Sequence, residues 1–274
     1  MRGWTKIVFL IAGFALAAGA YAGDDSHGGT KTTFWRIKGV SSKEKDLPKA
    51  VQALDRQAVE LIAAKKYNLA IAALTESLKQ YPANSAALAN RAHCYRTNGE
   101  FDKAVADYRK AKSIEPALEP FVDRMLGDMY LGRGRTRIDR GDLHGAADDL
   151  AKAAQVPATK ARALSELSYI ALVTHDFDTC IEMAARSQEA DPGFTDPRIN
   201  KGLCLLQSGR PREAIDSLSS AIRIDPNMGA AYINRAAAYV TVGDCAAAKK
   251  DAAAAAAVDP ASASIANRVI SSCL

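Results

Sequence analysis

Prolines recur along this 274-residue chain at a fixed interval. Pro82 and Pro116 are 34 residues apart, and the same interval separates Pro192, Pro226 and Pro260. Short words repeat in the same register, because LANRAHCY (88–95) and RINKGLCL (198–205) have a near-copy in YINRAAAY (232–239). A recurring interval of about 20 to 50 residues is typical of arrays of one supersecondary unit, so this interval constrains the fold more than composition does.

Side chains of matching size recur inside each interval, counted from residues 51, 85, 127, 161, 195 and 229. Position 8 is small: Ala58, Ala92, Gly134, Ser168, Gly202 and Ala236. Position 20 is also small: Ala70, Ala104, Ala146, Cys180, Ala214 and Ala248. Between them, near position 15, lies a glycine or polar turn. The proline at position 32 cannot continue a helix. Because small side chains let two helices approach closely, each interval predicts a helix, a turn and a second helix.

This pattern resembles the tetratricopeptide repeat family, whose units are 34-residue helix-turn-helix segments. The resemblance implies an all-α fold, a right-handed superhelical solenoid of about six units, since one helical hairpin cannot bury its apolar face alone. The solenoid would span residues 50–274, with units at about 51–84, 85–118, 127–160, 161–194, 195–228 and 229–262, and a cap helix at 263–274. The sequence departs from the family in lacking Trp at position 4 and in having Arg137 at position 11 of the third unit.

Eight additional residues fall within Ala117–Leu126. They predict either a first helix of the third unit that is longer by about two turns or a small bend after Pro120. The sequence does not choose between these alternatives.

The repeated Asn at position 6 lies on the side of the first helix opposite the small residues, because each residue turns by about 100°. In the family this side lines the concave groove, so the resemblance makes Asn90, Asn200 and Asn234 the leading binding candidates. An amide can both donate to and accept from a peptide group. The alternative is that these amides bond only between adjacent helices.

Other residues are expected on the same groove face: His93, Arg96, Arg135, Glu166, Tyr169, Leu203 and Gln207. The mixture is neither uniformly charged nor uniformly apolar. The family's clamp for a C-terminal carboxylate is not supported, because Asp55 and Val59 occupy the positions where it needs Lys and Asn.

Five cysteines are candidates for pairing if the chain is exported. In an array of the kind that the resemblance implies, Cys245 is expected near Cys273, and Cys180 near Cys204, with Cys94 left over. The alternative is that all are buried small apolar residues. The absence of a CxxC spacing argues against redox catalysis and against a zinc ribbon.

The N-terminus predicts a secretory signal peptide at residues 1–22. Arg2 and Lys6 precede an apolar run of roughly 16 residues, and Ala20 and Ala22 suit cleavage after Ala22. The alternative is an uncleaved anchor, since a run shorter than about 20 residues can still span a thinned bilayer. Residues 23–49 have no helical period and predict a flexible polar tether.

Charge and motifs exclude several functions. Loss of Arg2 and Lys6 with the signal peptide takes the formal charge from +5 to +3, which is too small to imply a polyanion partner such as nucleic acid. The basic run RGRTRIDR (133–140) predicts a solvated face or, alternatively, an anion site. His144 and His175 lie beside Asp142 and Asp176 without a nucleophile at an interpretable spacing. We therefore expect no enzyme, no metal site and no cofactor.

The expected function is that of an exported, periplasmic adaptor or scaffold that binds a protein or peptide segment in its concave groove during cell-envelope assembly. The alternative is a membrane-anchored organiser that keeps its N-terminal helix and acts by self-association or lipid contact. The sequence leaves the partner's identity and the oligomeric state open.

Overall fold

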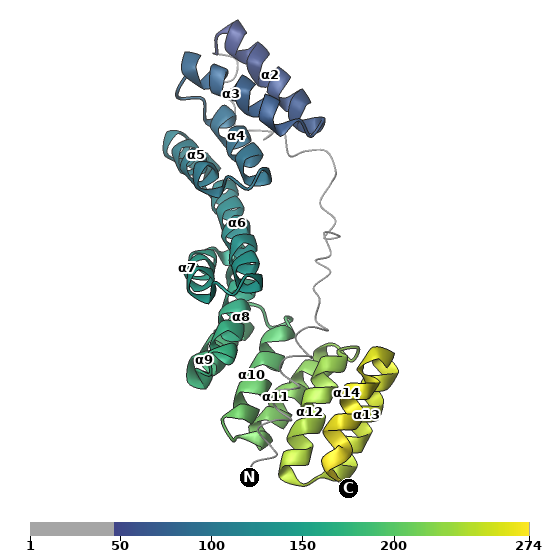
Figure 1. Cartoon of the computed structure of the whole chain (residues 1–274). Coiled ribbons are helices and arrows are strands. Elements are labelled where there is room, and N and C mark those ends of the chain that lie inside the picture. The colour runs from purple at the N-terminus through teal and green to yellow at the C-terminus, as the bar shows by residue number, and fades with distance from the viewer. Residues whose placement is uncertain (1–46, 274) are drawn as a thin grey trace. The chain divides into compact units, whose positions relative to one another are not determined.

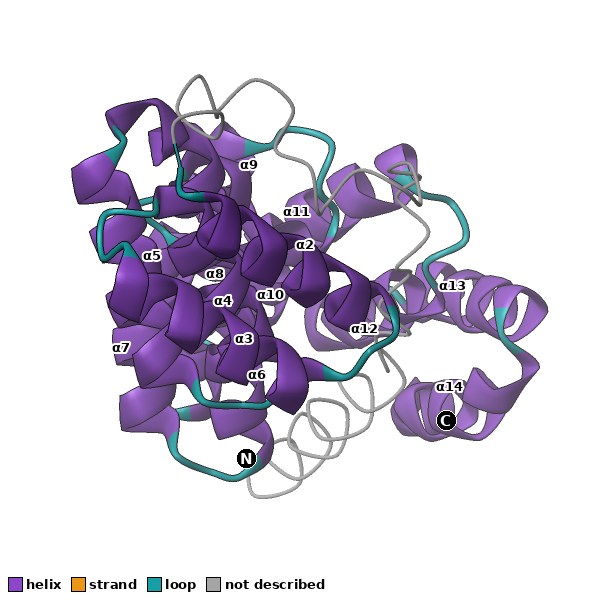
Figure 2. Ribbon diagram, turned by 90° about the horizontal axis from the view of Figure 1, so that it is seen from above, coloured by secondary structure: helices purple, strands orange, loops and turns teal. Residues whose placement is uncertain are grey.

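A computed structural model describes residues 47–273 of the chain, apart from the side chain of Ser272. The predicted signal peptide (1–22) and most of the predicted tether (23–49) lie outside the described residues. In the described part the regular elements are helices, and Figure 2 shows no strand there. These helices follow one another in consecutive pairs (Figure 1), which confirms the expected all-α class.

The chain divides into two compact bodies, whose boundary lies between Gly132 and Arg133. The described residues of the amino-terminal body are 47–132. Its helices pack as two hairpins, α2 with α3 and α4 with α5. Their bounds are α2 Lys49–Ala63, α3 Tyr67–Gln80, α4 Ser85–Thr97 and α5 Phe101–Ile114, followed by the 3-10 turn Pro116–Leu118 and by α6 Glu119–Asp139, inside which the boundary falls.

The described residues of the carboxy-terminal body are 133–273. After the end of α6 it contains α7 Leu143–Ala153, α8 Pro157–Val173, α9 Phe177–Ala190, α10 Asp196–Gln207, α11 Pro211–Ile224, α12 Gly229–Val242, α13 Cys245–Val258 and α14 Ala263–Ile270. Two 3-10 turns, Pro260–Ser262 and Ser271–Cys273, flank α14. The pairs α8–α9, α10–α11 and α12–α13 are hairpins, and each packs on its neighbour in the chain.

The predicted small residues lie where the two helices of a hairpin cross. Ala58, Ala70, Ala92 and Ala104 are fully buried in the amino-terminal body. In the carboxy-terminal body Gly202 is so close to α11 that a Cβ there would lie 2.6 Å from Cγ of Leu218. The repeated small side chain is therefore a steric requirement of the hairpin.

The turn inside each hairpin has a fixed backbone conformation. Position 15 of the repeat has a left-handed φ between 57° and 83°, at Lys65, Gly99, Gly141, His175, Gly209 and Gly243. Glycine dominates because it adopts this conformation without steric cost. The next residue is an aspartate in several repeats, and its side chain caps the second helix, as when Asp244 accepts from the backbone N–H of Ala247 at 3.0 Å.

The additional residues between 117 and 126 lengthen a first helix, as one of the two predictions had it. Helix α6 has 21 residues, whereas α4 has 13. Pro120 lies in the first turn of α6, where a missing backbone N–H breaks no helical hydrogen bond.

Candidate functional site

The repeated letters of the sequence include an arginine that links the two helices of a hairpin. Arg235 of α12 donates through Nε and Nη2 to Asp251 of α13, at 2.7 and 2.8 Å, and through Nη1 to Ser219 of α11, at 2.9 Å. In the amino-terminal body Arg91 contacts Asp107 and Thr75 in the same register. A two-pronged, largely buried contact of this kind fixes geometry. Sequence reasoning missed this role, although the NR pair at positions 6 and 7 is visible in LANRAHCY and YINRAAAY.

Arginines of the basic run at 133–140 make the same kind of arginine–aspartate contact between two helices. Arg133 donates to Asp149 of α7 at 2.7 Å through Nε and through Nη2, and Arg137 donates to the same carboxylate at 2.8 Å. Asp149 is fully buried. These arginines hold α6 against α7, so they do not form the anion site that was one of the two predictions.

The predicted asparagines are less accessible than expected. Asn90 is half-buried, while Asn200 is 7 % exposed and Asn234 is 0 % exposed. Leu203, expected on the same face, is 1 % exposed. The expectation that Asn200, Leu203 and Asn234 line an accessible surface is therefore corrected, because all three side chains are buried.

Asn200 makes the contact between adjacent helices that was the alternative prediction. Its Nδ2 donates to the backbone carbonyl of Ser165 at 3.1 Å and to Oγ of Ser168 at 2.8 Å, both on α8. For Asn234 the residues in the same register are Ile199 and Gly202, which offer no side-chain acceptor. Neither amide atom of Asn234 has a hydrogen-bond partner among the described residues.

His93 and Arg96 lie on one side of α4 in the amino-terminal body, and both are half-buried. The rings of His93 and Tyr67 meet edge to face with centroids 6.2 Å apart. Burial, together with the nearby charge of Arg96, lowers the pKa of His93 to about 4. The imidazole is therefore neutral at neutral pH.

Arg135, Glu166 and Tyr169 are brought together in the carboxy-terminal body. Nε of Arg135, on α6, donates to Glu166 of α8 at 2.7 Å, and the two side chains remain 31 % and 19 % exposed. Tyr169 follows Glu166 by one helical turn and is half-buried. Burial raises the pKa of its hydroxyl, and the charges of Glu166 and Asp139 add to the effect. Of the predicted set, these residues form a coherent, partly accessible polar patch, which we call the inner patch (Arg135, Glu166 and Tyr169).

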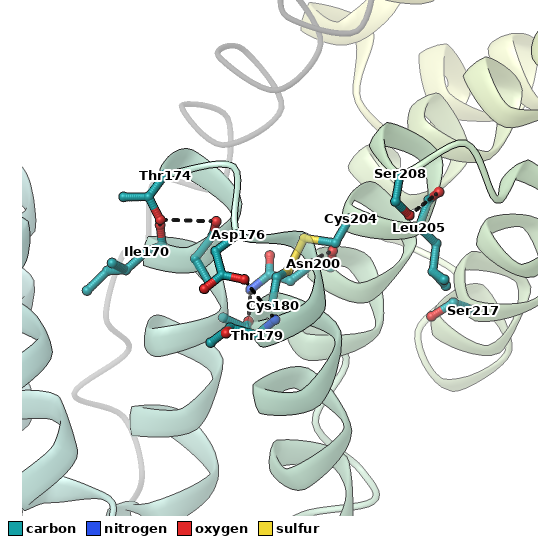
Figure 3. The surroundings of a disulfide bond; sticks show 12 residues. Ile170, Thr174, Asp176, Thr179, Cys180, Asn200, Cys204, Leu205, Ser208 and Ser217 are labelled. Atoms are coloured by element: carbon teal, nitrogen blue, oxygen red, sulfur yellow. Dashed lines mark hydrogen bonds between the residues drawn. A yellow bond between two sulfur atoms is a disulfide. The ribbon is translucent and has the colours of Figure 1, made fainter.

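Both predicted cysteine pairs are disulfides in the structure. Cys180 of α9 is bonded to Cys204 of α10, with Cα atoms 6.4 Å apart, as Figure 3 shows. Cys245, the first residue of α13, is bonded to Cys273, with Cα atoms 5.5 Å apart. Cys94 is free and buried, and burial raises the pKa of its thiol to about 11. The first bridge joins α9 to α10, and the second joins α13 to the 3-10 turn that follows α14.

Candidate chemistry beyond binding is sparse in residues 47–273. Asp142 and Asp176, which neighbour His144 and His175, serve as helix caps. No group of three or more His, Cys, Asp or Glu side chains in this range could hold a metal ion. Among the same residues, no helix combines the length and the apolar character that crossing a bilayer requires.

Comparisons with known proteins agree with this geometry. Residues 85–118 and 196–228 each match the tetratricopeptide repeat family. A yeast (Saccharomyces cerevisiae) protein, small glutamine-rich tetratricopeptide repeat-containing protein 2, is 41 % identical over 64 residues, which are 23 % of this chain and 18 % of the yeast protein. The match thus spans less than a fifth of that relative's length.

Two solved structures match this chain over 96 % of their own length. YrrB, described as a TPR protein with an unusual peptide-binding site, is 18 % identical with a TM-score of 0.52 over 71 % of this chain and 96 % of that one. MamA is 24 % identical with a TM-score of 0.48 over 63 % of this chain and 96 % of that one. The chain therefore carries tetratricopeptide repeats, at 85–118 and 196–228, in an all-α fold of consecutive helix pairs that it shares with a TPR protein of known structure.

Proposed function

We propose that the chain is an exported TPR scaffold that binds a segment of another protein, and that the inner patch contributes to the binding surface. The observation that carries the proposal is the ion pair between Arg135 and Glu166, which stays partly exposed beside Tyr169. The peptide-binding site described for YrrB supports the class of ligand.

The burial of Asn200 and Asn234 changes the expected mode of recognition. Amides that bond a ligand's backbone would accept many sequences, whereas a guanidinium, a carboxylate and a phenol select charged or hydrogen-bonding side chains. We therefore propose that the ligand segment carries charged side chains that compete for Arg135 and Glu166. Half-buried His93 and Arg96 remain candidates for a second contact region in the amino-terminal body.

Export and a role in the cell envelope belong to the same proposal. The disulfides Cys180–Cys204 and Cys245–Cys273 support it, because disulfides persist mainly in oxidising compartments. The N-terminal sequence supports it independently. Mass spectrometry of the purified protein tests this part: a mature chain starting at Gly23 is expected, and a membrane-bound product retaining Met1 would favour the anchored organiser instead.

A charge exchange tests the binding surface without removing the ion pair. The double variant Arg135→Glu/Glu166→Arg keeps opposite charges in contact but inverts their order along the surface. The matched control is Arg210→Glu/Glu213→Arg, which inverts a pair at the start of α11 whose side chains are 46 % and 56 % exposed. Both variants should keep the helical circular dichroism signal of the wild type.

The measurement is the amount of each envelope protein that binds to the immobilised wild type or to an immobilised variant. We expect the exchange at 135 and 166 to reduce recovery of a wild-type partner by about tenfold, which corresponds to roughly 1.4 kcal/mol. The control should leave recovery unchanged. Equal recovery by both folded variants would remove the inner patch from the binding surface.

A further inference from the structure

The disulfides of the carboxy-terminal body differ in their access to solvent. Cys180 and Cys204 are both 0 % exposed, and they lie within the core between α9 and α10. Cys245 and Cys273 are both partly exposed. A dissolved or protein-borne thiol must reach a sulfur atom to reduce a disulfide, so the second bridge is the accessible one.

The accessible disulfide holds a short helix. Helix α14 has 8 residues, and its buried residues are Ile265, Ala266 and Val269. Helices this short are unstable on their own in water. The bridge joins Cys273, just beyond α14, to the first residue of α13, so it fixes the far end of α14 to the hairpin.

Helix α14 covers an apolar surface of the last hairpin. It packs against both α12 and α13. Ile265 and Val269 belong to the same buried cluster as Ile233, Ala237 and Val240 of α12. Release of α14 would therefore expose the face of α12 that other hairpins use to pack against the next first helix.

We propose that the Cys245–Cys273 disulfide is a redox latch, whose reduction releases α14 and uncovers this face of α12. The reductant would be a dithiol of the thioredoxin class. One thiolate attacks a protein sulfur to form a mixed disulfide, and the second thiol resolves it. The products are the free thiols of Cys245 and Cys273 and the oxidised reductant, so two electrons and two protons are transferred. Cys180–Cys204 stays oxidised and keeps the preceding repeats together.

The first measurement uses the full mature chain and graded dithiothreitol under native conditions. Free thiols are alkylated, and each cysteine is quantified by mass spectrometry. We expect Cys245 and Cys273 to be labelled at dithiothreitol concentrations at least tenfold below those that label Cys180 and Cys204, because only the former pair is open to attack. Simultaneous labelling of both pairs would overturn the proposal.

The second measurement is hydrogen exchange of the backbone amides in 263–271 and in α12. In the reduced protein and in Cys245→Ser/Cys273→Ser, exchange in α14 should accelerate on the order of a hundredfold, because the bridge restrains a loop with a sequence separation of 28 residues. Exchange in α8 and α9 is the internal control and should not change. Unchanged protection of α14 in the double variant would show that the helix stays docked without the bridge, and the latch would be rejected.

Discussion

Two asparagines at the same position of successive repeats illustrate how one neighbouring side chain decides the cost of a buried polar group. Asn200 donates to Ser168, whereas Asn234 has Gly202 in that register. Gly202 cannot become Ser without meeting Leu218. The amide of Asn234 is thus buried at a position where nothing in the described structure bonds it.

The asparagines should therefore respond oppositely to the same substitution. Asn234→Leu should leave the free energy of unfolding unchanged or raise it by about 1 kcal/mol, because it removes an unpaired buried amide. Asn200→Leu should lower it by about 2 kcal/mol, because a hydrogen-bonded group is lost. Urea denaturation measures both. A loss at Asn234 as large as that at Asn200 would mean that its amide is satisfied in solution.

The imidazole of His93 predicts a pH dependence. Its pKa in the folded protein is about 4, below the reference value of 6.5, because burial disfavours the charged ring and the charge of Arg96 adds to the effect. The unfolded chain then binds a proton first as the pH falls, so the folded state loses stability from about pH 6.5 down to about pH 4.

Because water reaches part of the ring and screens its charge, the loss of folding stability amounts to about 2 kcal/mol. Wild type and His93→Gln should therefore differ in how much stability they lose between about pH 7 and about pH 4.5, with the variant losing less. Urea titrations at the two pH values give the comparison. Parallel losses in the two proteins would show that His93 is protonated in the folded state as readily as in the unfolded one.

Helical glycines look alike in a sequence pattern, but they differ in how much space surrounds them in the structure. Gly202 lies against Leu218, so a side chain there would push the two helices of a hairpin apart. A Cβ on Gly132, in α6, would meet no atom within 4 Å. Gly132→Ala should raise the free energy of unfolding by up to about 1 kcal/mol through helix propensity.

The matched substitution Gly202→Ala should lower the free energy of unfolding by about 1–3 kcal/mol through overpacking. Thermal or urea denaturation of both variants, with the wild type alongside, measures the difference. Stabilisation by Gly202→Ala would show that α10 and α11 can separate without cost.

The helices and turns could be predicted because the residues that determine them recur in each repeat. Small residues at positions 8 and 20, a left-handed turn residue and a terminal proline are local requirements, and each is visible in the sequence. Both disulfides followed from the same register. The burial of Asn200 and Asn234 could not be predicted, because it depends on how closely an adjacent repeat packs against them, as α8 packs against Asn200. The role of Arg235 was missed because its partners, Asp251 and Ser219, lie 16 residues away on either side.

At the scale of the whole chain, covalent reinforcement is distributed unevenly between the two bodies. In the described structure both disulfides lie in the carboxy-terminal body, while the amino-terminal body contains the free, buried Cys94. In repeat arrays, stability is approximately a sum of terms for each repeat and its neighbours. A lost cross-link should therefore weaken the body that contains it and leave the other body's own packing unchanged.

Cys180→Ala/Cys204→Ala tests this expectation, because the bridge closes a loop with a sequence separation of 24 residues. The free energy of unfolding of the carboxy-terminal body should fall by about 3 kcal/mol. Hydrogen exchange at graded urea concentrations resolves the bodies, with amides of α3 and α4 reporting on one and amides of α9 and α10 on the other. We expect the protection of α3 and α4 to be the same as in the wild type. A parallel loss in all four helices would mean that the bodies unfold as one cooperative unit, and the sum over neighbouring repeats would not describe this chain.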